Sequence, residues 1–130
     1  MSTNIGRILG VAFSLAGAQP ASALVQDYAF ELVSSEVKQS ERVTIVVRLI
    51  RKATGEAVPD AVIFAHRLDM EPDGMPTMTA PIEAAGTVVP GTYLFGVDIP
   101  MEGNWRLSLA AKLQGEDGTL QARLVVKAAP

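Results

Sequence analysis

The segment from His66 to Met78 holds the side chains of this sequence that are best suited to binding a metal ion. The chain has five methionines and one histidine, and Met70, Met75 and Met78 lie within nine residues, close to His66. Thioether sulfur is a soft ligand, and thioethers together with imidazole suit copper, above all Cu(I). The residue types therefore suggest a copper site that includes His66, Met70, Met75 and Met78.

The methionines also have a purely structural explanation. A methionine side chain is flexible and apolar, and it commonly fills irregular gaps in a protein core. Met101 lies in a turn just before Trp105, where packing near the indole is the simpler explanation. The alternative for Met101 is a fourth sulfur ligand, delivered from a neighbouring loop at the same end of the fold. The sequence leaves both explanations open.

The order Glu71-Pro72-Asp73-Gly74-Met75 predicts the tip of a β-hairpin. Proline presets the backbone for the first turn position, and glycine supplies the left-handed residue that ends a three-residue loop. The acidic residues of this tip would favour a bound cation, but the simpler explanation is a solvated turn. They also lack the spacing of oxygen ligands that a calcium loop needs.

The length of that loop decides which methionines share a face. A three-residue loop pairs Met70 with Pro76, Leu68 with Met78, and His66 with Ala80. His66, Met70 and Met78 then lie on one face, while Met75 points the other way. A two-residue loop instead pairs Met70 with Met75 and sends Met78 to the opposite face, beside Arg67. Because Pro76 and Pro81 cannot donate hydrogen bonds, we expect the return strand to be irregular or at a sheet edge.

The first residues predict a secretory signal peptide. Arg7 provides a short positive region, residues 8–18 are apolar, and Ala21-Ser22-Ala23 is a small-residue cleavage site. The apolar run is about half of the roughly 20 residues that a membrane-spanning helix needs. We therefore expect residues 1–23 to be removed, residues 24–130 to be exported to the periplasm, and no membrane span to remain.

Composition limits the remaining functions. Residues 24–130 are long enough for one domain with a self-sustaining core. The chain has no cysteine, so neither disulfides nor thiolate chemistry are available. The formal net charge of −3 argues against nucleic acid as a partner, since nucleic acid calls for a basic patch, and it gives no reason to expect an anionic membrane partner.

Short β-branched or alternating segments separated by Gly-rich turns predict an all-β protein. In residues 105–113 the apolar side chains alternate, which places Trp105, Leu107 and Leu109 on one face. The predicted strands are 28–33, 42–50, 61–66, 92–97, 105–113 and 120–127, with a short extended piece within 52–59. The predicted fold is an immunoglobulin-like antiparallel β-sandwich of about seven strands.

Three motifs resemble the YtkA-like/FixH-like domain family. They are the pattern M-x-P-x-G-M-x-x-M within residues 69–78, Pro90-Gly91-Thr92-Tyr93, and Met101-Glu102-Gly103-Asn104-Trp105, in that order. The likeness covers roughly residues 25–127. It implies an exported β-sandwich protein that accompanies a heavy-metal efflux system, or oxidase assembly and copper delivery. It also implies that Met70, Met75 and Met78 form the family's methionine-rich loop and that Met101 lies in its second methionine turn. FixH proper keeps a membrane anchor and lacks this methionine pattern.

Two functions from different classes follow from these observations. The first is a periplasmic copper-binding accessory protein that works with components of a metal-efflux or oxidase-assembly system. The second is an immunoglobulin-like module that docks on a periplasmic or membrane complex without metal, with exposed methionines as pliable contacts. An enzyme is not expected, because one histidine, no cysteine and scattered carboxylates provide no nucleophile–base arrangement or phosphate loop.

Overall fold

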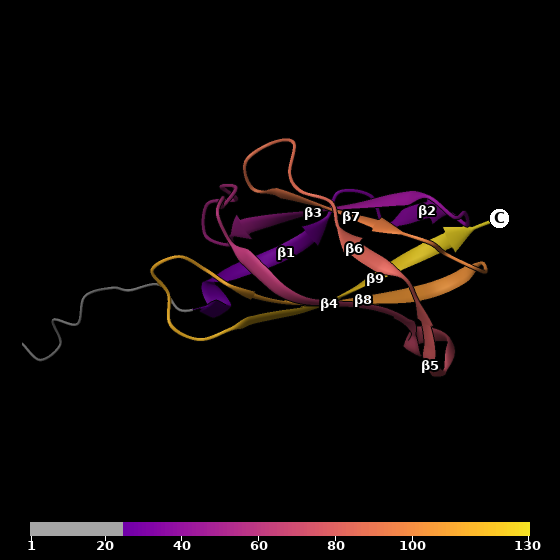
Figure 1. The fold of residues 1–130 in the computed structure, drawn as a ribbon. Coiled ribbons are helices and arrows are strands. Elements are labelled where there is room, and N and C mark those ends of the chain that lie inside the picture. The colour runs from indigo at the N-terminus through magenta and orange to yellow at the C-terminus, as the bar shows by residue number, and fades with distance from the viewer. Residues whose placement is uncertain (1–24) are drawn as a thin grey trace, which may run out of the picture.

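The computed structural model describes residues 25–130, so the predicted signal peptide lies outside the described residues. Within this range nine β-strands form two sheets that pack face to face as a sandwich (Figure 1). The other elements are the single-turn 3-10 helices η2 (Val25–Asp27) and η3 (Glu71–Asp73). No helix of the described range is long and apolar enough to cross a membrane.

The first sheet has four strands in the order β1-β3-β7-β6, and all its neighbours are antiparallel. Its central strand β3 is rich in β-branched residues, which favour a pleated and half-buried surface. Its strands are β1 (Tyr28–Leu32), β3 (Val43–Arg51), β7 (Thr92–Val97) and β6 (Ile82–Ala84).

The second sheet has five strands in the order β2-β9-β8-β4-β5. Its neighbours are antiparallel except for β2 and β9, which run parallel. Its strands are β2 (Glu36–Lys38), β9 (Leu120–Ala129), β8 (Gly103–Lys112), β4 (Val62–Met70) and β5 (Met75–Ala80).

The core lies between the two sheets and follows the alternation predicted from the sequence. Trp105, Leu107 and Leu109 of β8 are buried, while the residues between them are only partly covered. Ile45, Val47, Leu49 and Phe95 are among the residues that close the core from the other sheet. The prediction of an all-β sandwich is confirmed, and the strands beyond the expected seven are short pieces at sheet edges.

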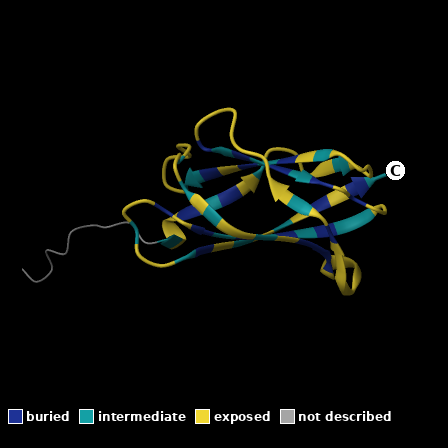
Figure 2. Cartoon of the chain, in the orientation of Figure 1, coloured by how far each residue is buried: buried dark blue, intermediate teal, exposed yellow. Residues whose placement is uncertain are grey.

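The β4–η3–β5 hairpin differs from the rest of the sandwich. It projects from the five-stranded sheet on the side away from the four-stranded sheet (Figure 1). Every residue from Glu71 to Thr79 is exposed, as Figure 2 shows for this hairpin. The segment that the sequence singled out for chemistry is therefore the part of the fold most open to solvent.

Candidate functional site

The tip of the hairpin is a one-turn 3-10 helix. Residues Glu71–Asp73 form η3 with Pro72 inside it, and Gly74 ends it with φ 80°, in the left-handed region. The backbone N–H of Gly74 donates to the carbonyl oxygen of Glu71 at 2.8 Å. The predicted hairpin tip and its left-handed glycine are confirmed, but four residues rather than three separate the paired residues Met70 and Met75.

The predicted three-residue register is wrong. Met70 pairs with Met75, as in the two-residue alternative, but Asp69 then pairs with Thr79 and Leu68 with Ala80. Residues 76–78 are extra residues on β5, which bulges at this point. The expected irregularity of the return strand is confirmed, and it fits Pro76, which has no N–H to continue the ladder. Met75 therefore pairs with Met70 just before the bulge, and Met78 is the last of the extra residues.

The four methionines of the described chain differ sharply in exposure. Met70 is 1 % exposed and belongs to the core, whereas Met75, Met78 and Met101 are 37 %, 38 % and 38 % exposed. Core packing therefore explains Met70 and leaves the other three unexplained. We call these four residues the methionine group.

Met101 lies in the turn that precedes β8. Its carbonyl oxygen accepts a hydrogen bond from the indole Nε1 of Trp105 at 3.2 Å, which fixes the turn against the core. Gly103, two residues further on, has φ 140°, and a Cβ there would lie 2.5 Å from Cε of Met70. The end of the Met70 side chain thus lies against the Met101 turn, and only a glycine leaves room for it.

Asp73 joins the hairpin tip to the same turn. Its Oδ2 accepts the backbone N–H of Asn104 at 2.8 Å, and its Oδ1 accepts the side-chain Nδ2 of Asn104 at 3.0 Å. These hydrogen bonds, the backbone one foremost, lower the pKa of the Asp73 carboxyl. Asp73 therefore positions the loop, and its oxygens are already engaged. Sequence reasoning missed Asn104 as the partner, although it lies within the second methionine motif.

Asp69 is buried beneath two arginines on the outward face of the five-stranded sheet. Its Oδ2 accepts from Arg67 Nε at 3.0 Å and from Arg106 Nη2 at 3.1 Å, and its Oδ1 accepts the backbone N–H of Glu71 at 2.9 Å. Burial raises the pKa of Asp69, but the Glu71 N–H and the two guanidinium groups outweigh it and leave that pKa below its ordinary value. The expected negative charge of Asp69 is thus neutralised, because the register places Arg106 directly opposite it.

The same network holds the irregular strand in place. Arg67 Nη2 donates to the carbonyl oxygen of Pro76 at 2.8 Å, within the bulge of β5. Arg106 Nη1 also lies 3.8 Å from Oε1 of Glu71 at the tip. Polar contacts therefore position both limbs of the hairpin where backbone pairing is interrupted.

The structure does not bring His66 to the methionine group. His66 pairs with Leu109, and its ring packs 5.5 Å from that of Phe95 on the opposite sheet. Its Nδ1 is buried and has no hydrogen-bond partner among the described residues. Along β4, Met70 lies four positions after His66, which corresponds to about 13 Å of strand.

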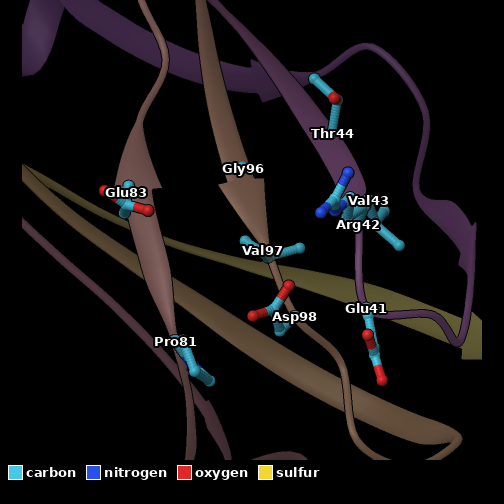
Figure 3. Close-up of a pocket in the computed structure, with 9 residues that line it drawn as sticks. All are labelled: Glu41, Arg42, Val43, Thr44, Pro81, Glu83, Gly96, Val97 and Asp98. Atoms are coloured by element: carbon cyan, nitrogen blue, oxygen red, sulfur yellow. The ribbon is translucent and has the colours of Figure 1, made fainter.

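A hollow of about 370 Å³ lies on the four-stranded sheet and is lined by residues of β3, β6 and β7 and of the loops beside them. Its carboxylates come from three separate places, Glu41 before β3, Glu83 on β6 and Asp98 after β7 (Figure 3). Nowhere in residues 25–130 do three or more His, Cys, Asp or Glu side chains gather closely enough to hold a metal ion.

Comparison with known proteins places the chain in a family. A sequence model described as YtkA-like matches residues 22–110, which include the hairpin and the Met101 turn. No protein of curated function matches the sequence.

Two solved structures are similar at low identity. The Lin-41 filamin domain is 17 % identical with a TM-score of 0.43, over 72 % of this chain and 89 % of that one. The ZirS C-terminal domain is 12 % identical with a TM-score of 0.44, over 98 % of this chain and 86 % of that one.

Proposed function

The chain belongs to the YtkA-like family, and from that membership we propose that it is an exported accessory protein which binds Cu(I) through the methionine group. The observation that carries the proposal is that three of the four described methionines are exposed, two on the hairpin and one on the turn that lies against it. Core packing gives no reason for thioethers at Met75, Met78 and Met101. A soft metal ion does.

The rigidity of the surrounding loops supports the proposal. Asp73 ties the tip to Asn104, and Arg67 ties β5 to the sheet. Ligands that are held before the metal arrives lose little conformational freedom on binding. The loops that carry Met75, Met78 and Met101 are therefore already joined.

Uncharged thioethers would also provide selectivity. They hold a soft monovalent ion, whereas Mg²⁺, Ca²⁺ and Zn²⁺ prefer oxygen, nitrogen or thiolate ligands. The nearby carboxylates of Asp69 and Asp73 are engaged by arginine and asparagine and add little for a hard cation. Ligation by His66 stays a separate prediction, because its ring faces Phe95 instead.

The proposed place of action is the periplasm, where the protein would hand copper to or receive it from an efflux or oxidase-assembly system. The signal-peptide pattern of residues 1–23 and the resemblance to the family support this location and role. Loops on a rigid β-scaffold suit such a transfer, because a partner can reach ligands that lie at the surface.

The test is an anaerobic titration of the protein with Cu(I) in competition with a chromogenic chelator. The wild-type protein should hold one tight equivalent, and the variant Met75→Leu/Met78→Leu/Met101→Leu should lose it without loss of fold. A matched control is Val33→Leu/Val62→Leu/Val88→Leu, which changes exposed apolar residues elsewhere and should bind copper normally. Equal competition by the wild type and the methionine variant would contradict the proposal. His66→Gln tests the histidine separately.

The same exposed methionines also favour a second function, docking on a protein complex without metal. Three flexible apolar side chains, two on the projecting hairpin and one on the neighbouring Met101 turn, offer an adaptable contact surface. This alternative predicts that the methionine variant fails to bind its complex in the absence of copper, whereas the copper proposal predicts a defect in copper retention.

A further inference from the structure

A shallow groove of about 200 Å³ lies on the outward face of the five-stranded sheet, across β4, β8 and β9. Arg67 and Arg123 stand at its sides with Ser108 between them, and Ala65, Ala110 and Gln121 continue its lining. The groove lies outside the methionine group.

The strand register builds this groove. Arg67 pairs with Ser108, and Ser108 pairs with Arg123, so the three residues form one row across three adjacent strands. Residues paired directly across a sheet point to the same face, and neighbouring strands lie about 4.8 Å apart. The two arginine backbones are therefore about 10 Å apart with a small hydroxyl side chain between them. Two alanines, Ala65 and Ala110, are paired in the next row and keep the floor low.

The face around the groove is strongly basic. Along β4, β8 and β9 as the structure describes them, the one outward carboxylate is Asp69, which is fully buried. The outward basic residues of these three strands are Arg67, Arg106, Lys112, Arg123 and Lys127. The chain as a whole carries a net charge of −3, so this face opposes the overall charge.

The outward face of the other sheet has no such excess. Arg48 on β3 forms an ion pair with Glu31 on β1 at 3.2 Å, and Glu83 lies outward on β6. The basic character is thus specific to one side of the sandwich. A charged patch of this kind directs the approach of a partner with the opposite charge.

The two arginines of the groove are not equally engaged. Arg67 uses Nε on Asp69 and Nη2 on Pro76, and its side chain is still 53 % exposed. Arg123 is exposed and makes no hydrogen bond or ion pair with any residue in the described range. A planar guanidinium binds a carboxylate through two parallel hydrogen bonds, which Arg123 is free to form.

We propose that this groove docks an acidic segment of a partner protein, with one carboxylate seated between Arg67 and Arg123 above Ser108. The width of the groove suits a single side chain, and the hydroxyl of Ser108 supplies a third donor. Val125, two residues from Arg123 on the same face and exposed, offers an apolar contact beside the carboxylate. The hairpin projects on the outward side of the same sheet (Figure 1), which favours a flexible peptide segment over a flat membrane surface as the occupant.

The proposal does not depend on copper, but its location is relevant to copper transfer. Arg67 contacts both the groove and the bulge of β5, so a docked acidic segment would lie next to the methionine hairpin. A partner held there would have its metal-binding residues within reach of the exposed methionines.

The probe for a test is a fluorescent peptide of alternating glutamate and valine, with a glutamine-for-glutamate peptide as its control. In fluorescence anisotropy the acidic peptide should bind the full chain, and the glutamine peptide should not. Arg123→Glu should weaken binding about tenfold or more, since it replaces an attraction by a repulsion, and Arg123→Gln should weaken it less. Arg123 makes no contact that the fold needs, so both variants should fold.

Arg48→Glu on the opposite sheet is the matched control for a change of overall charge, and it should leave peptide affinity within about twofold. Amide chemical shifts should move at Ser108, Ala110 and Gln121 when the peptide is added. Equal weakening by Arg48→Glu, or shifts spread over both sheets, would overturn the proposal. It would also be overturned if vesicles of anionic phosphatidylglycerol shifted the groove amides while the acidic peptide did not.

Discussion

Strands β3 and β4 are both nine residues long, yet they are buried by different means. In β3 buried and less buried residues alternate, and β1 and β7 pair with it from either side. In β4 the last three residues, Leu68, Asp69 and Met70, are all buried, and β5 pairs with these three alone. Apolar burial holds β3, whereas ion pairs and a folded hairpin cover the end of β4.

This difference sets the hairpin apart from the rest of the small domain. The apolar core between the two sheets provides most of the free energy of folding. The hairpin keeps Met75 and Met78 at the surface, and the buried carboxylate of Asp69 holds it through two arginines. Features that depart from a regular strand are where function is expected.

The largest effect should come from the regular strand. Leu49→Ala in β3 removes a fully buried side chain from between the sheets and should lower the free energy of unfolding by about 3 kcal/mol. Urea denaturation measures this loss. Substitution of its exposed neighbour, Arg48→Ala, should change the free energy of unfolding by less than about 1 kcal/mol. A comparable loss in both variants would contradict the view that apolar burial stabilises β3.

Asp69→Asn should act on the hairpin and should lower the free energy of unfolding by about 2 kcal/mol, less than Leu49→Ala does. The substitution leaves the two guanidinium groups without their shared carboxylate, while the shape of the side chain stays the same. Hydrogen exchange of the β5 amides should accelerate much more than that of the β3 amides. Uniform acceleration in both strands would show that the network supports the whole fold and not the hairpin.

Gly103→Ala should lower the free energy of unfolding by about 1–2 kcal/mol. The added Cβ would meet Cε of Met70 and lie 2.7 Å from Oδ2 of Asp73, at a φ of 140° that side chains rarely adopt. Gly96→Ala is the control, because a Cβ there meets nothing within 4 Å. Thermal unfolding compares the two, and an unchanged melting temperature in Gly103→Ala would refute the close contact of the two loops.

The pH dependence of the free energy of unfolding should show a smaller effect, which comes from the carboxylates at and near the hairpin. The pKa of Asp69 is lower in the folded protein than its ordinary value, so its contribution is complete at neutral pH and is lost as pH falls below about 4. Asp73 acts in the same direction. The stability of Asp69→Asn, followed by denaturation between pH 7 and pH 3, should fall less steeply than that of the wild type. An identical slope would contradict an ionised Asp69 in the folded state.

Met75→Leu and Met78→Leu should have the smallest effect on stability, within about 0.5 kcal/mol, since both side chains are largely at the surface. Met70→Leu should cost more, because Met70 is buried against the Met101 turn. Thermal unfolding compares the three variants. A large loss in the Met75 or Met78 variant would indicate that these residues are structural.

The sequence predicted those parts of the fold that depend on neighbours along the chain. The alternation through Trp105, Leu107 and Leu109 identified the core face of β8, and Gly74 identified the hairpin tip. The sequence predicted an irregular return strand but not the position of its bulge, because nothing local specifies that pairing resumes at Thr79 opposite Asp69.

The predicted site also depends on contacts between residues that are distant in the sequence. The turn that carries Met101 lies against the hairpin through Gly103 and Met70, which are far apart in sequence. Likewise, nothing local to Asp69 reveals that Arg106 pairs with it from the next strand. His66 looked like a ligand because it is near the methionines in sequence, although its side chain packs on Phe95.

The most direct test of the methionine group is NMR of the protein labelled at the methionine ε-methyl carbons, during anaerobic addition of Cu(I). The methyl resonances of Met70, Met75, Met78 and Met101 are local reporters of sulfur ligation. We predict that the resonances of the exposed Met75, Met78 and Met101 shift together and that all changes are complete at one equivalent, while the His66 ring resonances report separately on ligation by the imidazole. If copper binds while the methionine methyl resonances stay in place, the methionine group is not the copper site.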